Sequence, residues 1–283
     1  MTISIQGNIG SFSHIAATNL FGSGIQLLER DSFKEVFDDL KNDRCESIVI
    51  PIENSTYGSI FQNYDLLGSN DFEIYKEVYL KIKFHLIGLP ASSFEDIVEL
   101  HSHPVGLGQI SKFLEENRQI KAIEFPDTAG AVKMVKETND LTKAAVASKF
   151  ASNIYGMQIL KEDIHENQNN YTRFFALRKR KNIEQLTAQS PKLAKAKTTI
   201  KFQLGEESGS LYKCIGAFAK RDLALVKIES RPIINTHWEF TFYLDIKADL
   251  NGIEMQEAIE EMKLYSKDFS VLGCYDKGVY IDT

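Results

Sequence analysis

Apolar and polar positions along the first two-thirds of the chain alternate between two spacings. Apolar side chains between residues 33 and 40 lie at i, i+3, i+4 and i+7, which predicts an amphipathic helix capped by Asp31 and Ser32. Short apolar runs such as Thr2–Gln6 and Ser47–Ile52 are typical of buried strands. Strands that alternate with helices in this way predict an α/β fold with parallel strands.

A longer alternating run occupies Val78–Leu89 and ends at Pro90. Its period of two predicts one continuous strand, long enough to pass between two lobes. His85 falls on the polar phase of this run, so we expect it on the solvent side and not as a ligand.

The last third has the order β-α-β-β-α-β, a split βαβ or ferredoxin-like unit. One face of such a sheet carries the two helices, so the other face or an edge needs a partner, and dimerisation is a reasonable hypothesis. The predicted segments are Thr198–Leu204, Ser210–Lys220, Leu223–Ile228, Trp238–Ile246, a helix striped by apolar residues from Met255 to Tyr265, and Val271–Tyr275.

Between these regions, residues 179–197 are basic and poor in large apolar side chains, as in a domain linker. A site for an anionic partner is the alternative, and we favour a solvated hinge. The predicted division is therefore a larger α/β domain with two lobes over 1–178, a linker over 179–197 and a smaller domain over 198–283.

Composition restricts the classes of function. A net charge of −6 over 283 residues gives no electrostatic footprint for nucleic acid. No apolar stretch approaches the roughly 18 residues of a membrane span, and the first ten residues do not resemble a signal peptide. The three cysteines are far apart and lack metal-type spacing, which indicates thiols of a cytoplasmic protein.

Polar clusters follow four of the predicted strands. Since open α/β sheets bind ligands at the carboxyl ends of their strands, we expect these clusters to line one cleft, although each alone is also explained as a helix cap or a tight turn. The clusters are Gly7–Ser13, Glu53–Ser59, Ser102–Gln109 and Asn169–Arg173.

Within these clusters, Arg173 presents a donor fork suited to a carboxylate, and Thr172 offers a hydroxyl beside it. Gly10 and Ser11 lie at a strand–turn–helix junction that favours an anion, but the spacing matches neither a dinucleotide site nor a P-loop. We interpret His103, beside Pro104, as structural.

Together these motifs resemble the signatures of the prephenate dehydratase family, in the family's order and over nearly the whole chain. The matching segments are Gly7-x-x-Gly10-Ser11-Phe12-Ser13, Pro51-Ile52-Glu53-Asn54-Ser55, Ser102-His103-Pro104 with Gln109, Asp127-Thr128-Ala129, Tyr155-Gly156, Asn170-x-Thr172-Arg173-Phe174 and Glu229-Ser230-Arg231-Pro232.

The resemblance implies a two-lobed fold similar to type II periplasmic binding proteins, which holds prephenate between its lobes and converts it to phenylpyruvate without a metal or cofactor. It implies that Thr172 assists departure of the ring hydroxyl. The residues it implies for substrate binding are Gly10, Ser11, Asn54, Ser55, Ser102, Gln109 and Arg173.

The resemblance also implies a C-terminal regulatory ACT domain that binds L-phenylalanine, in a homodimer or homotetramer. The implied effector residues are Gly209, Ser210, Leu211, Glu229, Ser230, Arg231 and Pro232. The chain departs from the family at Val105 and Ile110, which we expect to affect packing only. It also has Ala224-Leu225-Val226 where the family has Asn-Leu-Thr, so we expect weakened or altered effector binding.

Two other functions stay open at this point. An arogenate dehydratase would prefer the amino form of the substrate. A non-catalytic binder of an amino acid or small carboxylate would use the same cleft without converting prephenate.

Overall fold

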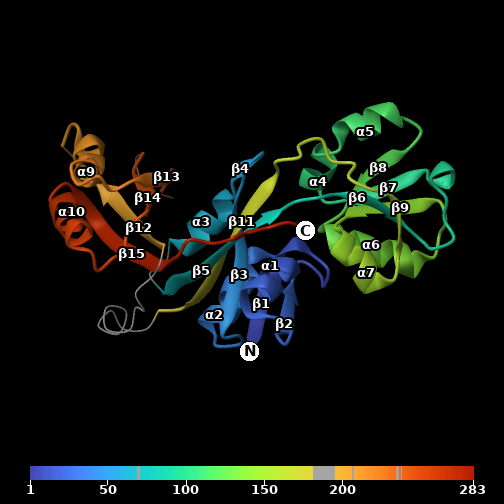
Figure 1. Ribbon diagram of the computed structural model, residues 1–283, viewed down its shortest axis with the longest axis horizontal. Coiled ribbons are helices and arrows are strands. Elements are labelled where there is room, and N and C mark those ends of the chain that lie inside the picture. Colours follow the sequence, from blue (N-terminus) through green and yellow to red (C-terminus); the bar gives the residue numbers. More distant parts are fainter. Residues whose placement is uncertain (69–70, 181–194, 206, 234–235, 237) are drawn as a thin grey trace. The chain divides into compact units, whose positions relative to one another are not determined.

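The computed structural model describes residues 1–68, 71–180, 195–205, 207–233, 236 and 238–283 (Figure 1). It forms two compact units, described separately below: unit 1 comprises Met1–Ile60, Val78–Phe174 and Val279–Thr283, and unit 2 comprises Phe61–Glu77 and Phe175–Gly278. The predicted linker over 179–197 lies largely outside the described residues, since 181–194 are not described.

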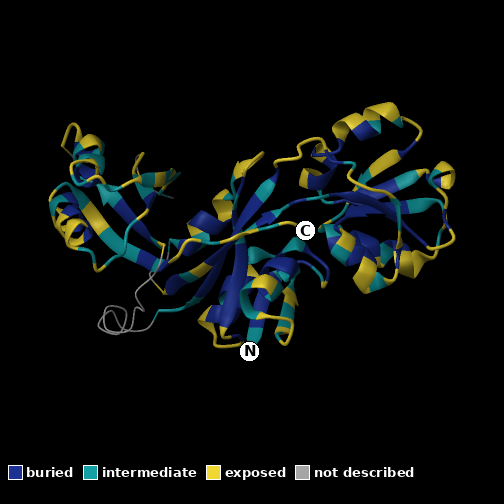
Figure 2. Cartoon of the chain, in the orientation of Figure 1, coloured by how far each residue is buried: buried dark blue, intermediate teal, exposed yellow. Residues whose placement is uncertain are grey.

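The first sheet has the order β16-β5-β11-β3-β1-β2, with β4 paired to β3. Its central strands β1 and β3 are parallel, as the apolar runs predicted, and are buried on both faces (Figure 2). The pattern of apolar positions did not predict β2 or β16. The strands are β1 (Thr2–Gln6), β2 (Gln26–Arg30), β3 (Ser47–Asn54), β4 (Gly58–Ser59), β5 (Phe72–Lys81), β11 (Tyr171–Lys179) and β16 (Tyr280–Ile281).

Two helices of unit 1 follow these strands, α1 (Phe12–Phe21) and α2 (Phe33–Lys41). α2 begins where the sequence predicted, because the Ser32 side chain accepts from the Glu35 backbone N–H while the Glu35 side chain accepts from the Ser32 backbone N–H. Its apolar stripe, Val36, Phe37 and Leu40, is buried. The helix is thus fixed at its start by a capping box and along one side by packing.

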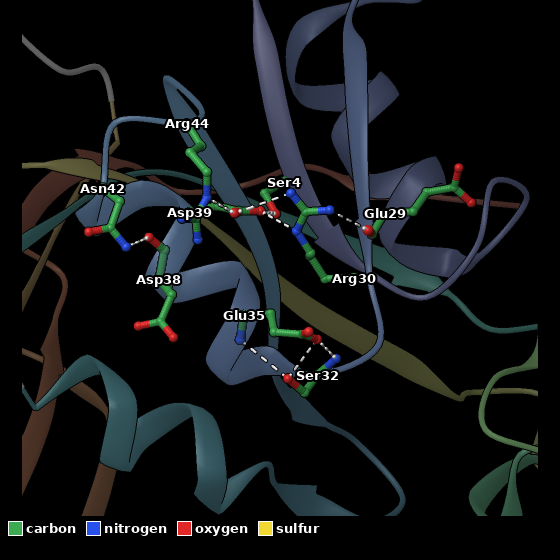
Figure 3. A network of polar contacts seen from close by, with 9 residues as sticks. All are labelled: Ser4, Glu29, Arg30, Ser32, Glu35, Asp38, Asp39, Asn42 and Arg44. Atoms are coloured by element: carbon green, nitrogen blue, oxygen red, sulfur yellow. Dashed lines mark hydrogen bonds and ion pairs between the residues drawn. The ribbon is translucent and has the colours of Figure 1, made fainter.

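Beside this stripe, Asp39 of α2 is buried among three donors (Figure 3). Its carboxylate accepts from Ser4 Oγ at 2.7 Å, from Arg30 Nε at 2.7 Å and from Arg44 Nε at 2.6 Å. Burial alone would raise the pKa of Asp39, but hydrogen bonds from Arg30, Arg44 and Ser4 outweigh it, so the pKa lies below its ordinary value of 3.8.

We expect Asp39→Asn to lower the free energy of unfolding by about 1–3 kcal/mol, since it removes charged hydrogen bonds in a buried position. A lowered folded-state pKa means that this stability is present above the unfolded-state pKa and is lost as the pH falls through the folded-state pKa. Urea unfolding at several pH values checks both points. A variant whose stability falls in acid as steeply as that of the wild type would contradict the assignment.

The second sheet of unit 1 has the order β10-β6-β9-β7-β8 and is flanked by α4 to α7 (Figure 1). Buried Ala129, Val132 and Val135 of α6 pack with Ile87 and Ala145 of the sheet. The elements are β6 (His85–Gly88), β7 (Glu99–Ser102), β8 (Lys121–Glu124), β9 (Lys143–Ala147), β10 (Gln158–Lys161), α4 (Pro104–Gly108), α5 (Ser111–Glu116), α6 (Thr128–Thr138), α7 (Lys149–Tyr155) and a short 3-10 helix at Phe94–Asp96.

Two expectations for Val78–Leu89 were wrong. The run forms β5 and β6 with a break at residues 82–84, because Ile82 N–H donates to Asn170 O while Phe84 N–H donates to His165 Nδ1. His85 is 5% exposed and its Nδ1 accepts from Asp163 N–H. It is buried because the segment that follows β10 covers it, as the hydrogen bond from Asp163 N–H shows.

The ferredoxin-like unit predicted for the last third is confirmed within unit 2. Its four-stranded sheet has the order β13-β14-β12-β15, and the two helices pack on one face around Phe202, Phe218 and Leu244 (Figure 1). Its elements are β12 (Ala196–Leu204), α9 (Ser210–Ala219), β13 (Leu225–Pro232), β14 (Phe240–Ile246), α10 (Ile253–Lys263) and β15 (Ser266–Asp276).

The opposite face of this sheet contacts residues 61–68 and 71–77 of the same unit, which include helix α3 (Phe61–Leu67). Tyr243 Oη donates to Tyr64 O at 2.9 Å, and Lys201 Nζ donates to Gly68 O at 2.5 Å. A Cβ added at Gly273 would clash with the backbone oxygen of Ile74, so this position admits only glycine. The chain itself therefore supplies a partner for this face, and the oligomeric state stays a prediction.

Candidate functional site

A network of side-chain amides joins three of the four polar clusters in unit 1. At the end of β3, Asn54 Oδ1 accepts from the backbone N–H groups of Thr56 and Tyr57, both at 2.9 Å. Asn54 Nδ2 donates to Thr172 Oγ1 at 2.9 Å and to Asn170 Oδ1 at 2.8 Å. The turn after β3 therefore fixes the amide that faces the start of β11.

The network continues from Asn170 into the second lobe of unit 1. Asn170 Nδ2 donates to Gln109 Oε1, and Gln109 ends the short helix α4. Asn54, Gln109 and Thr172 are each 8% exposed, and Asn170 is 1% exposed. The structure thus brings together predicted site residues that are separated by more than a hundred positions along the chain.

Thr172 has one further hydrogen-bonding capacity in this arrangement. Its oxygen accepts from Asn54 Nδ2, so the hydroxyl proton must point elsewhere. Among the residues that the structure describes, this O–H has no acceptor. Thr172 can therefore act as a donor toward a bound molecule.

Ser55 and Ser102 make different contacts. Ser55 is exposed and ties β3 to β11, because its Oγ donates to Asn169 O at 3.0 Å and accepts from Tyr171 N–H at 2.9 Å. Ser102 is fully buried and its Oγ donates to Val146 O at 2.7 Å. In this structure both serines support the backbone around the network and are not members of it.

Gly10 and Ser11 form a separate junction at the start of α1. Gly10 has φ +97°, and a Cβ there would lie 3.2 Å from Ala151 Cα, so glycine is needed on both counts. Ser11 caps α1 by accepting from His14 N–H. The N–H groups of Phe12 and Ser13 have no acceptor within the described part of the chain, which leaves a helix N-terminus suited to an anion.

One aromatic residue lies between this junction and the Ser102 turn. Phe84, in the segment that joins the two lobes, packs edge-on against Phe12 with ring centres 5.6 Å apart. Its ring also lies 3.5 Å from a Cβ built at Gly106, and the same Cβ would lie 2.9 Å from Ser102 Oγ. Phe84 therefore packs against Phe12 of α1 and lies close to Gly106 of α4.

Arg173 lies outside the amide network. Successive strand residues point to opposite faces, so its side chain leaves β11 on the face away from Thr172. It is 4% exposed, with Nη1 4.0 Å from Glu53 Oε2 and its guanidinium carbon 5.9 Å from the centre of the Tyr79 ring. The structure does not bring Arg173 to the Thr172 hydroxyl, and its role toward a carboxylate stays a prediction.

Burial favours the neutral form of two histidines near these clusters. Burial lowers the pKa of His14 and of His103, despite the opposing effects of Glu29 on the first and Asp127 on the second. His103 caps α4 by accepting from Val105 N–H, as its structural interpretation predicted. No group of three or more metal-ligating side chains occurs among the described residues.

The predicted effector residues lie in two places in unit 2. Gly209 (φ +80°), Ser210 and Leu211 start α9. Of the β13 residues, Arg231 forms a two-pronged pair with Asp65, at 2.8 and 2.9 Å, above the Phe61 ring. Glu229 lies 3.3 Å from Lys227 on the same face, whereas Ser230 and Pro232 are on the opposite, exposed side.

Asn170 is a member of the network but not one of the residues predicted for the site, although it belongs to the motif Asn170-x-Thr172. The signal that could have found it is its spacing. Residues i and i+2 of a strand point to the same face of the sheet. Asn170, immediately before β11, and Thr172 have this spacing, which predicts that their side chains point the same way.

These features define a class of protein: a two-lobed α/β unit of the periplasmic-binding type with a ferredoxin-like unit. Solved structures share this fold. A quorum-quenching acylase, GqqA, has a TM-score of 0.87 at 26% identity and covers 98% of both chains. A prephenate dehydratase from Arthrobacter aurescens, in complex with L-Phe, has a TM-score of 0.87 at 21% identity, covering 98% of this chain and 90% of its own.

The family model for prephenate dehydratase matches residues 3–182. A bifunctional chorismate mutase/prephenate dehydratase from Buchnera aphidicola is 34% identical over 96% of this chain and 70% of its own length. An arogenate dehydratase/prephenate dehydratase from Arabidopsis thaliana is 34% identical over 96% of this chain and 71% of its own. The chain belongs to the prephenate dehydratase family, a family of enzymes. None of its described helices is long and apolar enough to cross a membrane.

Proposed function

We propose that the protein catalyses the decarboxylative dehydration of prephenate to phenylpyruvate, with Thr172 as the residue that assists the leaving hydroxyl. The observation that carries this proposal is the bond from Asn54 Nδ2 to Thr172 Oγ1, which leaves the Thr172 O–H as a donor. The family membership supplies the substrate class.

The reaction needs little covalent chemistry from the protein. The ring C–COO⁻ bond breaks to release CO2, its electron pair enters the ring, and the ring C–OH bond breaks as hydroxide departs and takes up a proton to form water. Aromaticity of the product supplies the driving force. A threonine hydroxyl is a weak acid, so Thr172 stabilises the departing oxygen by hydrogen-bond donation, and the proton comes finally from solvent.

Binding the substrate requires donors for two carboxylates. The N-terminus of α1, with the Phe12 and Ser13 N–H groups, offers one set. Gln109 Nε2 offers another, because Gln109 Oε1 is already occupied by Asn170. These contacts hold the ring so that the leaving hydroxyl faces Thr172, and positioning of this kind supplies a large part of a rate enhancement.

A single assay separates the candidate functions. Prephenate, arogenate and an N-acyl amide are offered separately, with phenylpyruvate, phenylalanine and free amine as the respective readouts. Conversion of prephenate supports the proposal. Preferential conversion of arogenate would instead assign the protein the arogenate dehydratase activity, the first of the two activities in the name of the Arabidopsis relative. Amine release instead would indicate the activity named for GqqA, and binding of prephenate without turnover would indicate a non-catalytic binder.

We propose further that residues 198–283 act as a regulatory ACT domain whose effector is L-phenylalanine, the ligand named for the Arthrobacter structure. Arg231 links this part of unit 2 to α3 through Asp65, so binding near Glu229–Pro232 has a direct contact through which to act.

A homodimer or homotetramer in the cytoplasm fits the three free cysteines and the family pattern. A monomer in size-exclusion chromatography at micromolar concentration would contradict the oligomer.

Effector binding is expected to be weaker than in relatives with the Asn-Leu-Thr pattern, because Ala224 and Val226 lack polar side-chain groups. We expect the double substitution Ala224→Asn/Val226→Thr to tighten L-phenylalanine binding roughly tenfold, the value of about one hydrogen bond to a charged ligand. Isothermal titration calorimetry measures the change. Equal affinity before and after the substitution would show that these positions do not contact the ligand.

A further inference from the structure

Asn170 lies at the centre of the amide network and makes contacts on three sides. Its Oδ1 accepts from Asn54 Nδ2 at 2.8 Å, its Nδ2 donates to Gln109 Oε1 at 2.5 Å, and its backbone oxygen accepts from Ile82 N–H at 2.8 Å. It is 1% exposed. The side chain is therefore held in one place and one orientation.

The orientation of each amide follows from the backbone. Asn54 Oδ1 accepts two backbone N–H groups, and only the oxygen of an amide can accept, so Nδ2 must face Asn170 and Thr172. Asn170 must then turn its oxygen to Asn54 and its nitrogen to Gln109. Gln109 in turn must present its oxygen to Asn170. The two backbone N–H groups thus determine the direction of every hydrogen bond in the network.

The consequence is a fixed set of outward donors. At one end the Thr172 O–H is left to donate, and at the other the Gln109 Nε2 group is left to donate, since neither has an acceptor among the described residues. A substrate with two carboxylates and a departing hydroxyl requires donors at both ends. A reversed Gln109 would present an oxygen to an anion, which costs binding.

We infer that Asn170 is a positioning residue that orients Gln109, so that Gln109 Nε2 donates to a carboxylate of the substrate. This inference rests on the proposed function. It assigns Asn170 an effect on substrate binding through Gln109, distinct from the effect of Asn54 on the Thr172 hydroxyl.

The test is a double-mutant cycle between Asn170→Asp and Gln109→Met. The introduced aspartate has the shape of asparagine and still accepts from Asn54, but its carboxylate repels Gln109 Oε1 and favours the reversed amide. We expect N170D to raise KM for prephenate roughly 10- to 100-fold, the loss of one charge-assisted hydrogen bond, with a much smaller change in kcat. In the Gln109→Met background, N170D should change KM little further, because no amide remains to reverse.

Each outcome bears on the inference. If the KM increases of the two single variants multiply in the double variant, the inference is overturned. The introduced carboxylate would then act on the substrate or on Thr172 directly, and not through Gln109. A fall in kcat with unchanged KM would also overturn it. If N170D does not fold, as judged by circular dichroism, Asn170→Ala takes its place: alanine removes the group that orients Gln109, and its effect on KM should again be largely absent in the Gln109→Met background. If the wild type does not convert prephenate, the proposed function and this inference are both overturned. If the wild type converts prephenate but the KM effects of the two substitutions multiply, only the inference is overturned.

Discussion

Thr172→Val is expected to lower kcat for prephenate by about 10²- to 10³-fold, the range for removing one donor aimed at developing charge. Valine has nearly the same shape, so the strand and its packing are retained. What is lost is the O–H that the Asn54 contact leaves available to the departing hydroxyl. The effect should fall on kcat far more than on KM, because a leaving group gains charge only in the transition state.

The matched control is Thr172→Ser, which keeps the hydroxyl and removes only a methyl group. We expect serine to recover most of the activity, at a small cost from its freer side chain. Steady-state kinetics with prephenate measures all three proteins. Undiminished kcat in a folded Thr172→Val protein would remove Thr172 from the chemistry and leave the reaction to binding and positioning alone.

The second large effect concerns a buried ion pair within unit 2. Lys197 Nζ lies 2.8 and 2.9 Å from the two oxygens of Glu77, and the side chains are 3% and 0% exposed. Glu77 also accepts from Gly278 N–H at 2.9 Å. The pair joins β12, the first strand of the ferredoxin-like sheet, to β5.

We expect Lys197→Met to lower the free energy of unfolding by about 3–5 kcal/mol, because it removes an ammonium group that donates to both oxygens of a fully buried carboxylate. Adding Glu77→Gln should recover much of that loss, since glutamine is neutral and still accepts from Gly278 N–H. Urea denaturation followed by circular dichroism gives both values. A double variant as unstable as Lys197→Met would show that the pair contributes through packing and not through charge.

The predictions from sequence were most successful where the determining interactions are local. The cap of α2 at Ser32, the structural role of His103 and the order of elements in the ferredoxin-like unit each depend on residues near one another in the chain, and each is present. His85 shows the limit of the same reasoning. Its place in an alternating run indicated solvent, but the distant segment that follows β10 covers it, with Asp163 N–H donating to its Nδ1.

The linear chain was enough to define most helices and strands, the family and the set of polar residues from which a site would be built, because side-chain spacing and motif order can be read without a fold. Which of those residues meet was decided by the tertiary structure alone. Asn170 reaches Gln109 across 61 positions, Arg173 is turned away from Thr172 by the pleat of one strand, and residues 61–77 cover the sheet face that was predicted to need a partner. The physical reason is that such contacts depend on how distant segments pack, which no local period records.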